Sequence, residues 1–178
     1  LDFLNKKGSW KKRLSAAKRR ADEMVQSLLD LYVKRHNLYR KPFILDKNME
    51  KDFINSFSYI DTEDQASAWN EISLDMSGKV PMDRLLCGDV GFGKTELAIR
   101  ASFRCVFSNK RAVVLAPTTI LVNQLYSSFK SRFSAFGVSI EKVSRFCSNK
   151  QIAHTKTLIH NKKNDILIGT HSILNDNA

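Results

Sequence analysis

The sequence predicts an α/β protein built on a parallel sheet with helices on both faces. Short apolar runs suited to buried strands alternate with longer segments of helical periodicity. Connections of helix length between strands favour parallel pairing in three layers. A glycine-rich segment, G-x-x-x-x-G-K-T at residues 88–95, joins the first predicted strand to a helix. The predicted strands are residues 84–87, 112–116, 138–143 and 165–169, and the predicted helices among them are residues 96–107, 118–133 and 151–160.

A long helix is predicted before this region, from an N-cap at Ser9 to about Tyr39. Its end is set by Pro42, because proline disfavours helical backbone at the preceding residue. Apolar side chains recur at steps of four and three, as on one face of an amphipathic helix: Trp10, Leu14, Ala17, Ala21, Met24, Leu28 and Leu31. Two interpretations stay open: the helix packs on a neighbouring domain with its charges solvated, or it contacts DNA or transmits motion between domains.

Charge divides the chain into two parts. Residues 1–42 contain twelve Lys or Arg and four Asp or Glu, so they carry +8 of the net charge of +11. We expect residues 1–42 to form a basic amphipathic linker helix and residues 43–178 to form the α/β domain. A strongly basic balance favours an anionic partner, most simply nucleic acid.

The composition also argues against several classes of protein. No apolar run approaches the eighteen residues of a membrane-spanning helix, and the N-terminus lacks the apolar block of a signal peptide. A cytoplasmic protein that does not act at a membrane is therefore expected. The three cysteines, Cys87, Cys105 and Cys147, lack the spacing of a zinc site or a disulfide framework, and the four histidines form no ligand cluster.

Residues 85–95, Leu-Leu-Cys-Gly-Asp-Val-Gly-Phe-Gly-Lys-Thr, match a phosphate-binding loop. In such loops backbone N–H groups surround the phosphates, a lysine reaches the terminal phosphates and a Ser or Thr hydroxyl binds Mg²⁺. Lys94 and Thr95 are therefore the candidate catalytic residues, and Thr95 is the candidate metal ligand. Gly91 and Gly93 would relieve crowding where the backbone meets phosphate. The expected nucleotide-binding set is Gly88, Asp89, Val90, Gly91, Phe92, Gly93, Lys94 and Thr95.

Thr62 and Gln65 have the spacing of a capping box before a predicted helix at residues 63–76. A shorter helix is expected around residues 48–56. The capping box alone would explain the Thr-x-x-Gln pattern. A glutamine amide nevertheless offers both a donor and an acceptor, which suits reading an adenine edge, and Phe57 nearby could stack on the ring. We therefore retain Phe57 and Gln65 as candidate adenine-binding residues.

Hydroxyl and basic side chains follow the predicted strands. Because ligands gather beyond the carboxyl ends of parallel strands, these side chains are candidates for contact with nucleic-acid phosphates. For either threonine that follows the second strand, a simple helix cap is an equally good explanation. The residues concerned are Thr118, Thr119, Arg145, Thr170 and His171.

Four blocks of sequence together resemble the first motor lobe of the bacterial transcription-repair coupling factors, which are superfamily 2 translocases on double-stranded DNA. The blocks are the phosphate loop with its flanks at residues 82–96, Ala-Pro-Thr-Thr at 116–119, Ser-Arg-Phe at 144–146 and Ile-Gly-Thr-His at 168–171. The resemblance covers nearly the whole chain, and Trp10 to Arg35 resemble the helix that leads into that motor. It implies a RecA-like fold of the P-loop NTPase class.

The resemblance implies ATP and Mg²⁺ as cofactors and ATP-driven movement along duplex DNA. It implies displacement of stalled RNA polymerase and recruitment of an excision-repair protein, through regions outside these residues. Phe57 and Gln65 would read adenine, and Gln124 would join the DNA-facing residues. The alternatives are the motor lobe of a related fork-remodelling helicase, a P-loop nucleotide switch or kinase, and a nucleic-acid-binding module without enzymatic activity.

The chain stops at Ala178, before an Asp-Glu pair that could follow the Gly-Thr-His strand. In the family that the sequence resembles, this pair holds Mg²⁺ and a second lobe supplies arginines. We therefore expect a lobe that is incomplete at its C-terminus and that alone does not hydrolyse ATP in response to DNA.

Overall fold

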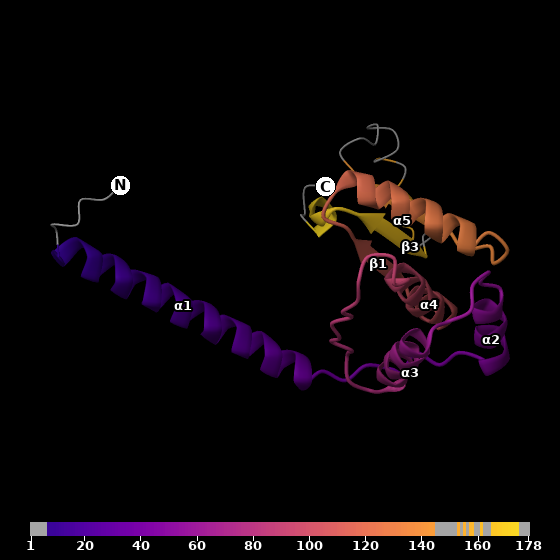
Figure 1. Ribbon diagram of the computed structural model, residues 1–178, viewed down its shortest axis with the longest axis horizontal. Coiled ribbons are helices and arrows are strands. Elements are labelled where there is room, and N and C mark those ends of the chain that lie inside the picture. Colours follow the sequence, from indigo (N-terminus) through magenta and orange to yellow (C-terminus); the bar gives the residue numbers. More distant parts are fainter. Residues whose placement is uncertain are drawn as a thin grey trace. The chain divides into compact units, whose positions relative to one another are not determined.

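The computed structural model describes residues 7–144, 153, 155, 157, 158, 161 and 165–174. The chain forms two compact units (Figure 1). The first contains Leu1–Lys41 together with Lys79–Pro81, and the second contains Pro42–Gly78 and Met82–Ala178.

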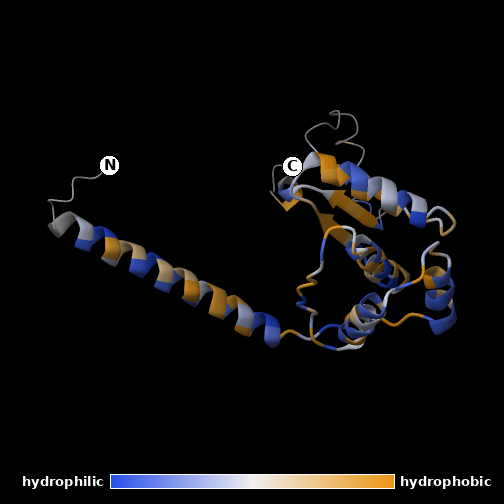
Figure 2. Ribbon diagram, in the orientation of Figure 1, coloured by the Kyte–Doolittle hydropathy of each residue, from blue (hydrophilic) through white to orange (hydrophobic). Residues whose placement is uncertain are grey.

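The first unit is dominated by one helix, α1, which spans Lys7–His36. Ser9 lies inside α1, so its prediction as the N-cap is wrong. The helix ends at His36, shortly before the predicted end near Tyr39, and a turn follows at Asn37. Beyond the turn, Arg40 N donates a hydrogen bond to Lys79 O at 2.7 Å. Apolar and hydrophilic residues alternate along α1 (Figure 2), and the predicted apolar face is exposed, Trp10 by 69%. Within the described residues, no helix is long and apolar enough to cross a membrane.

The second unit contains a parallel sheet, which confirms the predicted fold class. Its strands β1 (Ala112–Leu115), β2 (Ile140–Val143) and β3 (Ile166–Gly169) lie in the order β1-β3-β2. Leu115 and Val143 both pair with Gly169, so the three strands end at one edge. The helices are α2 (Lys47–Asn55), α3 (Glu63–Ser77), α4 (Lys94–Phe107) and α5 (Thr119–Arg132), followed by a 3-10 turn, η1, at His171–Leu174. The helix predicted at residues 151–160 falls largely outside the described residues.

The strand predicted at residues 84–87 is not formed. A strand needs a neighbour for its backbone hydrogen bonds, whereas this segment runs beside α3, where Arg84 binds the carboxylates of Asp75 and Glu71. Leu85 is 87% exposed, and Leu86 packs against the cluster that contains Trp69. The apolar run therefore serves as a connection to the phosphate loop, with one partly buried side chain, that of Leu86.

Phenylalanine side chains form the centre of the larger core. The ring centroids of Phe53 in α2 and Phe103 in α4 lie 3.8 Å apart, nearly parallel, and Phe133 after α5 is 5.4 Å from Phe53. These rings pack with Ile166 and Ile168 of β3 in one cluster of buried residues. The core therefore joins α2, α4 and α5 to the sheet.

Replacing Phe103 by alanine should lower the free energy of unfolding by about 3–5 kcal/mol, because a fully buried aromatic ring leaves a cavity when it is removed. Urea unfolding followed by circular dichroism measures the change. Tyr39→Ala is the matched control, since Tyr39 is 80% exposed and should lose little stability. Equal losses in the two variants would contradict the assignment of this core.

Candidate functional site

The loop at residues 88–93 has the backbone form that close approach to an anion requires. Gly91 and Gly93 have φ angles of 85° and 74°, in the left-handed region that glycine adopts freely. Gly93 is the N-cap of α4, and no side chain caps this helix. Glu96 N donates to Gly93 O at 2.9 Å. The positive end of the α4 dipole and its free amides therefore face the loop.

Lys94 closes over the loop that precedes it. Its Nζ donates to Gly88 O at 2.6 Å and to Asp89 O at 2.5 Å. The ammonium is thus held by two carbonyl oxygens of the loop, and Thr95 is exposed in the first turn of α4. A cation, a hydroxyl and left-handed glycines at one helix N-terminus fit the phosphates of a nucleotide and its metal ion.

Gln65 connects α3 to this loop. The predicted capping box is formed, because Gln65 Oε1 accepts from Thr62 N at 2.9 Å and Thr62 Oγ1 accepts from Gln65 N at 3.3 Å. Gln65 Nε2 also donates to Phe92 O at 2.8 Å. A Cβ placed on Gly93 would lie only 2.5 Å from Nε2. The structure therefore brings Gln65 into contact with the predicted phosphate-binding residues, across 27 positions of sequence.

Glu96, Arg100 and Arg132 form a buried ionic network that the sequence analysis did not identify. Arg100 donates to Asp61 through Nη1 and Nη2 at 2.6 and 2.8 Å and to Glu96 through Nε at 3.0 Å. Arg132 donates to Glu96 at 2.9 and 2.7 Å. The four-residue spacing of Glu96 and Arg100 is a usable signal for a helical ion pair, but nothing local indicates Arg132.

Burial by itself lowers the pKa of the Arg100 guanidinium, but the hydrogen bonds and charges of Asp61 and Glu96 outweigh it and raise that pKa above its ordinary value. The ion pairs of Arg100 therefore favour its charged form. Phe57 lies against this network, half-buried, with the guanidinium of Arg132 5.2 Å from its ring centroid. Of the two candidate adenine-binding residues, Gln65 contacts the phosphate loop directly. Phe57 contacts Arg132, which binds Glu96 in the first turn of α4.

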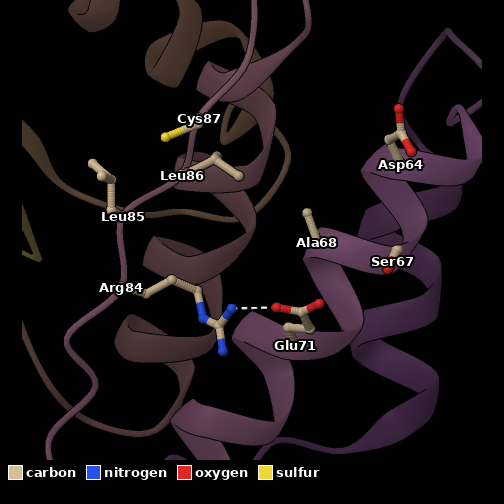
Figure 3. Close-up of a pocket in the computed structure, with 8 residues that line it drawn as sticks. All are labelled: Asp64, Ser67, Ala68, Glu71, Arg84, Leu85, Leu86 and Cys87. Carbon is tan, nitrogen blue, oxygen red and sulfur yellow. Dashed lines mark hydrogen bonds and ion pairs between the residues drawn. The ribbon is translucent and has the colours of Figure 1, made fainter.

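A hollow of about 250 Å³ lies between α3 and the segment before the phosphate loop (Figure 3). The side chain of Arg84 extends across this hollow and binds Glu71. Its hydrogen bond to Asp75 is the main reason that the pKa of the Arg84 guanidinium is raised. Its lining residues are Asp64, Ser67, Ala68, Glu71, Arg84, Leu85, Leu86 and Cys87. Mixed charges and a single exposed thiol give this hollow no defined ligand chemistry.

The candidate DNA-facing residues form a second group. Thr118 and Thr170 follow β1 and β3, which end at the same edge of the sheet. Thr118 Oγ1 accepts from Leu121 N at 3.3 Å, so Thr118 caps α5, while Thr119 is buried. Gln124 is exposed on α5, and His171 is exposed at the start of η1. Arg145 lies outside the described residues.

The chain belongs to the DEAD/DEAH box helicase family, because residues 62–178 match the model of that family. The matched region begins at Thr62, the cap of α3, and includes the phosphate loop, the sheet and η1.

Transcription-repair-coupling factors are similar over almost the entire chain, which confirms the resemblance drawn from the sequence. The factor of Borreliella burgdorferi is 44% identical over 174 residues, which cover 98% of this chain and 15% of that protein. The factor of Escherichia coli is 41% identical over 166 residues, which cover 93% of this chain and 14% of that protein. The chain thus spans only a small part of the length of these relatives.

A solved structure of RecG bound to a three-way DNA junction has the same fold. Its TM-score is 0.74 at 29% sequence identity, over 80% of this chain and 20% of that chain. The fold is therefore that of a RecA-like helicase lobe, as the sequence predicted.

The separate contacts of Thr62 and Gln65 predict separate effects. Thr62→Ala removes only the cap, so it should lower the free energy of unfolding by about 1 kcal/mol and leave nucleotide affinity unchanged. Gln65→Ala should lower stability similarly and also reduce the preference for ATP over GTP, because its amide lies at the loop. Chemical unfolding and nucleotide titration measure the two effects. Unchanged discrimination in Gln65→Ala would leave Gln65 with structural contacts alone.

Proposed function

We propose that this chain is the ATP-binding part of an ATP-dependent double-stranded DNA translocase that removes stalled RNA polymerase and couples transcription to nucleotide excision repair. The observation that carries the proposal is the phosphate loop at the start of α4, with left-handed Gly91 and Gly93 and with Lys94 Nζ held by carbonyl oxygens of the loop. The similarity to transcription-repair-coupling factors over 98% of the chain supports the particular activity.

ATP with Mg²⁺ is the nucleotide we assign to this loop. Lys94 would reach the terminal phosphates, Thr95 would bind the metal ion, and the loop amides of residues 88–93 would surround the phosphates. Gln65 supplies an amide at the loop, and Phe57 supplies an aromatic ring beside Arg132, which binds Glu96 in the first turn of α4; a ring and an amide suit an adenine base. Hydrolysis would supply the free energy for movement along DNA.

Duplex DNA is the partner we assign to the edge at which the strands end. Thr118, Thr170 and His171 gather there, and Gln124 is exposed on the helix that starts beside them. Arg145 completes the proposed set, whereas Thr119, which was predicted with it, is buried and is not assigned to the DNA. RNA polymerase and an excision-repair protein would contact other regions of such a translocase. We place the proposed activity in the cytoplasm.

A second candidate is the motor lobe of a fork-remodelling helicase. It is favoured by the similarity to RecG, whose structure was solved on a three-way DNA junction. Sequence identity to the transcription-repair-coupling factors is higher and extends over more of this chain, which favours the first candidate.

Lys94→Ala should weaken ATP binding at least about tenfold, because a charge-assisted contact to the phosphates contributes more than about 1.5 kcal/mol. The fold should persist, since Nζ contacts only carbonyls of the loop. Titration of a fluorescent ATP analogue gives both affinities. Lys110→Ala is the control, because Lys110 is exposed after the end of α4. Equal affinities in wild type and Lys94→Ala would contradict the phosphate-loop assignment.

Gln124→Glu should weaken binding to duplex DNA several-fold, because it places a carboxylate where the DNA phosphates would lie. Fluorescence anisotropy at several salt concentrations measures affinity, which should fall steeply with salt in the wild type. Ser127→Glu, an equal charge change at another exposed position of α5, is the control. The same loss in both variants would mean that only net charge matters and that Gln124 is not at the DNA.

A further inference from the structure

We propose that Arg132 is a positioning residue for the base of the nucleotide, an inference that rests on the proposed function. It starts from the surroundings of the Phe57 ring, which lies in the connection between α2 and α3. The guanidinium carbon of Arg132 is 5.2 Å from the ring centroid, and that of Arg100 is 5.8 Å from it. Both distances fall within the range of cation–π attraction. Two cations therefore hold a ring that is only half-buried and keeps part of its surface open to a ligand.

Arg132 is itself held by neighbours on several sides. Its side chain is 14% exposed, and Nε and Nη2 donate to the two oxygens of Glu96. Nη1 donates to Ser56 Oγ at 2.8 Å, and Nη2 donates to Phe53 O at 3.1 Å. Its guanidinium also lies 4.4 Å from the Phe53 ring centroid. Because Ser56 directly precedes Phe57 and Phe53 lies one helical turn before it, Arg132 fixes both the ring and the backbone from which it projects.

Glu96 connects Arg132 to the phosphate loop. It follows Thr95 directly, and its N–H donates to Gly93 O at 2.9 Å. Arg132 therefore binds the first turn of α4 through Glu96 while it contacts Phe57. The position of the ring relative to the phosphate loop is thereby set before a ligand binds. A nucleotide that contacted both the Phe57 ring and the phosphate loop would not have to order the ring on binding. This preorganisation increases affinity for the nucleotide.

The geometry requires arginine at this position. A guanidinium offers a rigid fork of donors that binds both oxygens of one carboxylate and a flat face that stacks on rings, whereas a lysine ammonium offers neither. Lys130 provides a contrast on the same helix, because it is exposed and lies 5.9 Å from the Tyr126 ring centroid, away from Phe57. We therefore predict that a positive charge alone at position 132 is not enough to hold the Phe57 ring in position.

The experiment compares ATP with inorganic tripolyphosphate, which carries phosphates but no base. Isothermal titration would measure both ligands on the 178-residue chain with Mg²⁺ present. Arg132→Gln should weaken ATP binding about fivefold to tenfold and change tripolyphosphate binding less than twofold. Arg132→Lys should also lose affinity for ATP, and it serves as the second variant should Arg132→Gln fail to fold. Lys130→Gln should bind both ligands as the wild type does.

A double-mutant cycle with Phe57→Ala tests whether Arg132 acts through the ring. Adding Arg132→Gln, or Arg132→Lys, to Phe57→Ala should cause no further loss of ATP affinity. Equal weakening of ATP and tripolyphosphate, or an additive loss in the double variant, would overturn the inference and leave Arg132 as a support for α4. Wild-type chain that binds neither ligand would overturn the proposed function, and this inference with it.

Discussion

The second unit depends on one buried carboxylate. The side chain of Glu96 is 8% exposed and accepts hydrogen bonds from two guanidiniums, Arg100 of its own helix and Arg132 at the end of α5. A buried charge is costly unless it is paired and hydrogen-bonded, so each member of the group requires the others. Asp61, bound by Arg100, brings the connection before α3 into the same group. Two segments far apart in sequence, the connection before α3 and the end of α5, are thus held against the first two turns of α4.

A second buried arginine repeats this arrangement at the other end of α4. Arg104 donates to both carboxylate oxygens of Glu50 in α2, at 2.7 and 2.6 Å, and to Ser73 O in α3 at 2.6 Å. Its guanidinium also lies 5.5 Å from the Trp69 ring centroid. Arginines at successive turns of α4 therefore join α2 and α3 to it, while phenylalanines join it to α5 and the sheet. The helix that starts at the phosphate loop is consequently held by directional contacts at both ends.

Local patterns in the sequence predicted the elements whose causes are local. The Thr-x-x-Gln spacing predicted the capping box of α3, because the two residues that form it are close in the chain. Apolar spacing and short apolar runs predicted α5 and the three strands as elements, although the pairing of those strands joins residues that are far apart. Residues 84–87 were predicted wrongly as a strand, because an apolar run does not reveal whether a pairing partner lies beside it. Arg132 was missed for a similar reason, since 36 positions separate it from Glu96.

Because Gly93 lies against the Gln65 amide, the effect of a substitution at either position depends on the residue at the other. Any side chain at position 93 would be strained at a φ of 74° and would also displace Nε2 of Gln65, which at present occupies the space of a Cβ. A smaller residue at position 65 would remove the second obstacle but not the first, and it would also remove half of the cap of α3. Substitutions at 93 should therefore be epistatic with those at 65, while the positive φ keeps glycine favoured at 93 whatever residue stands at 65.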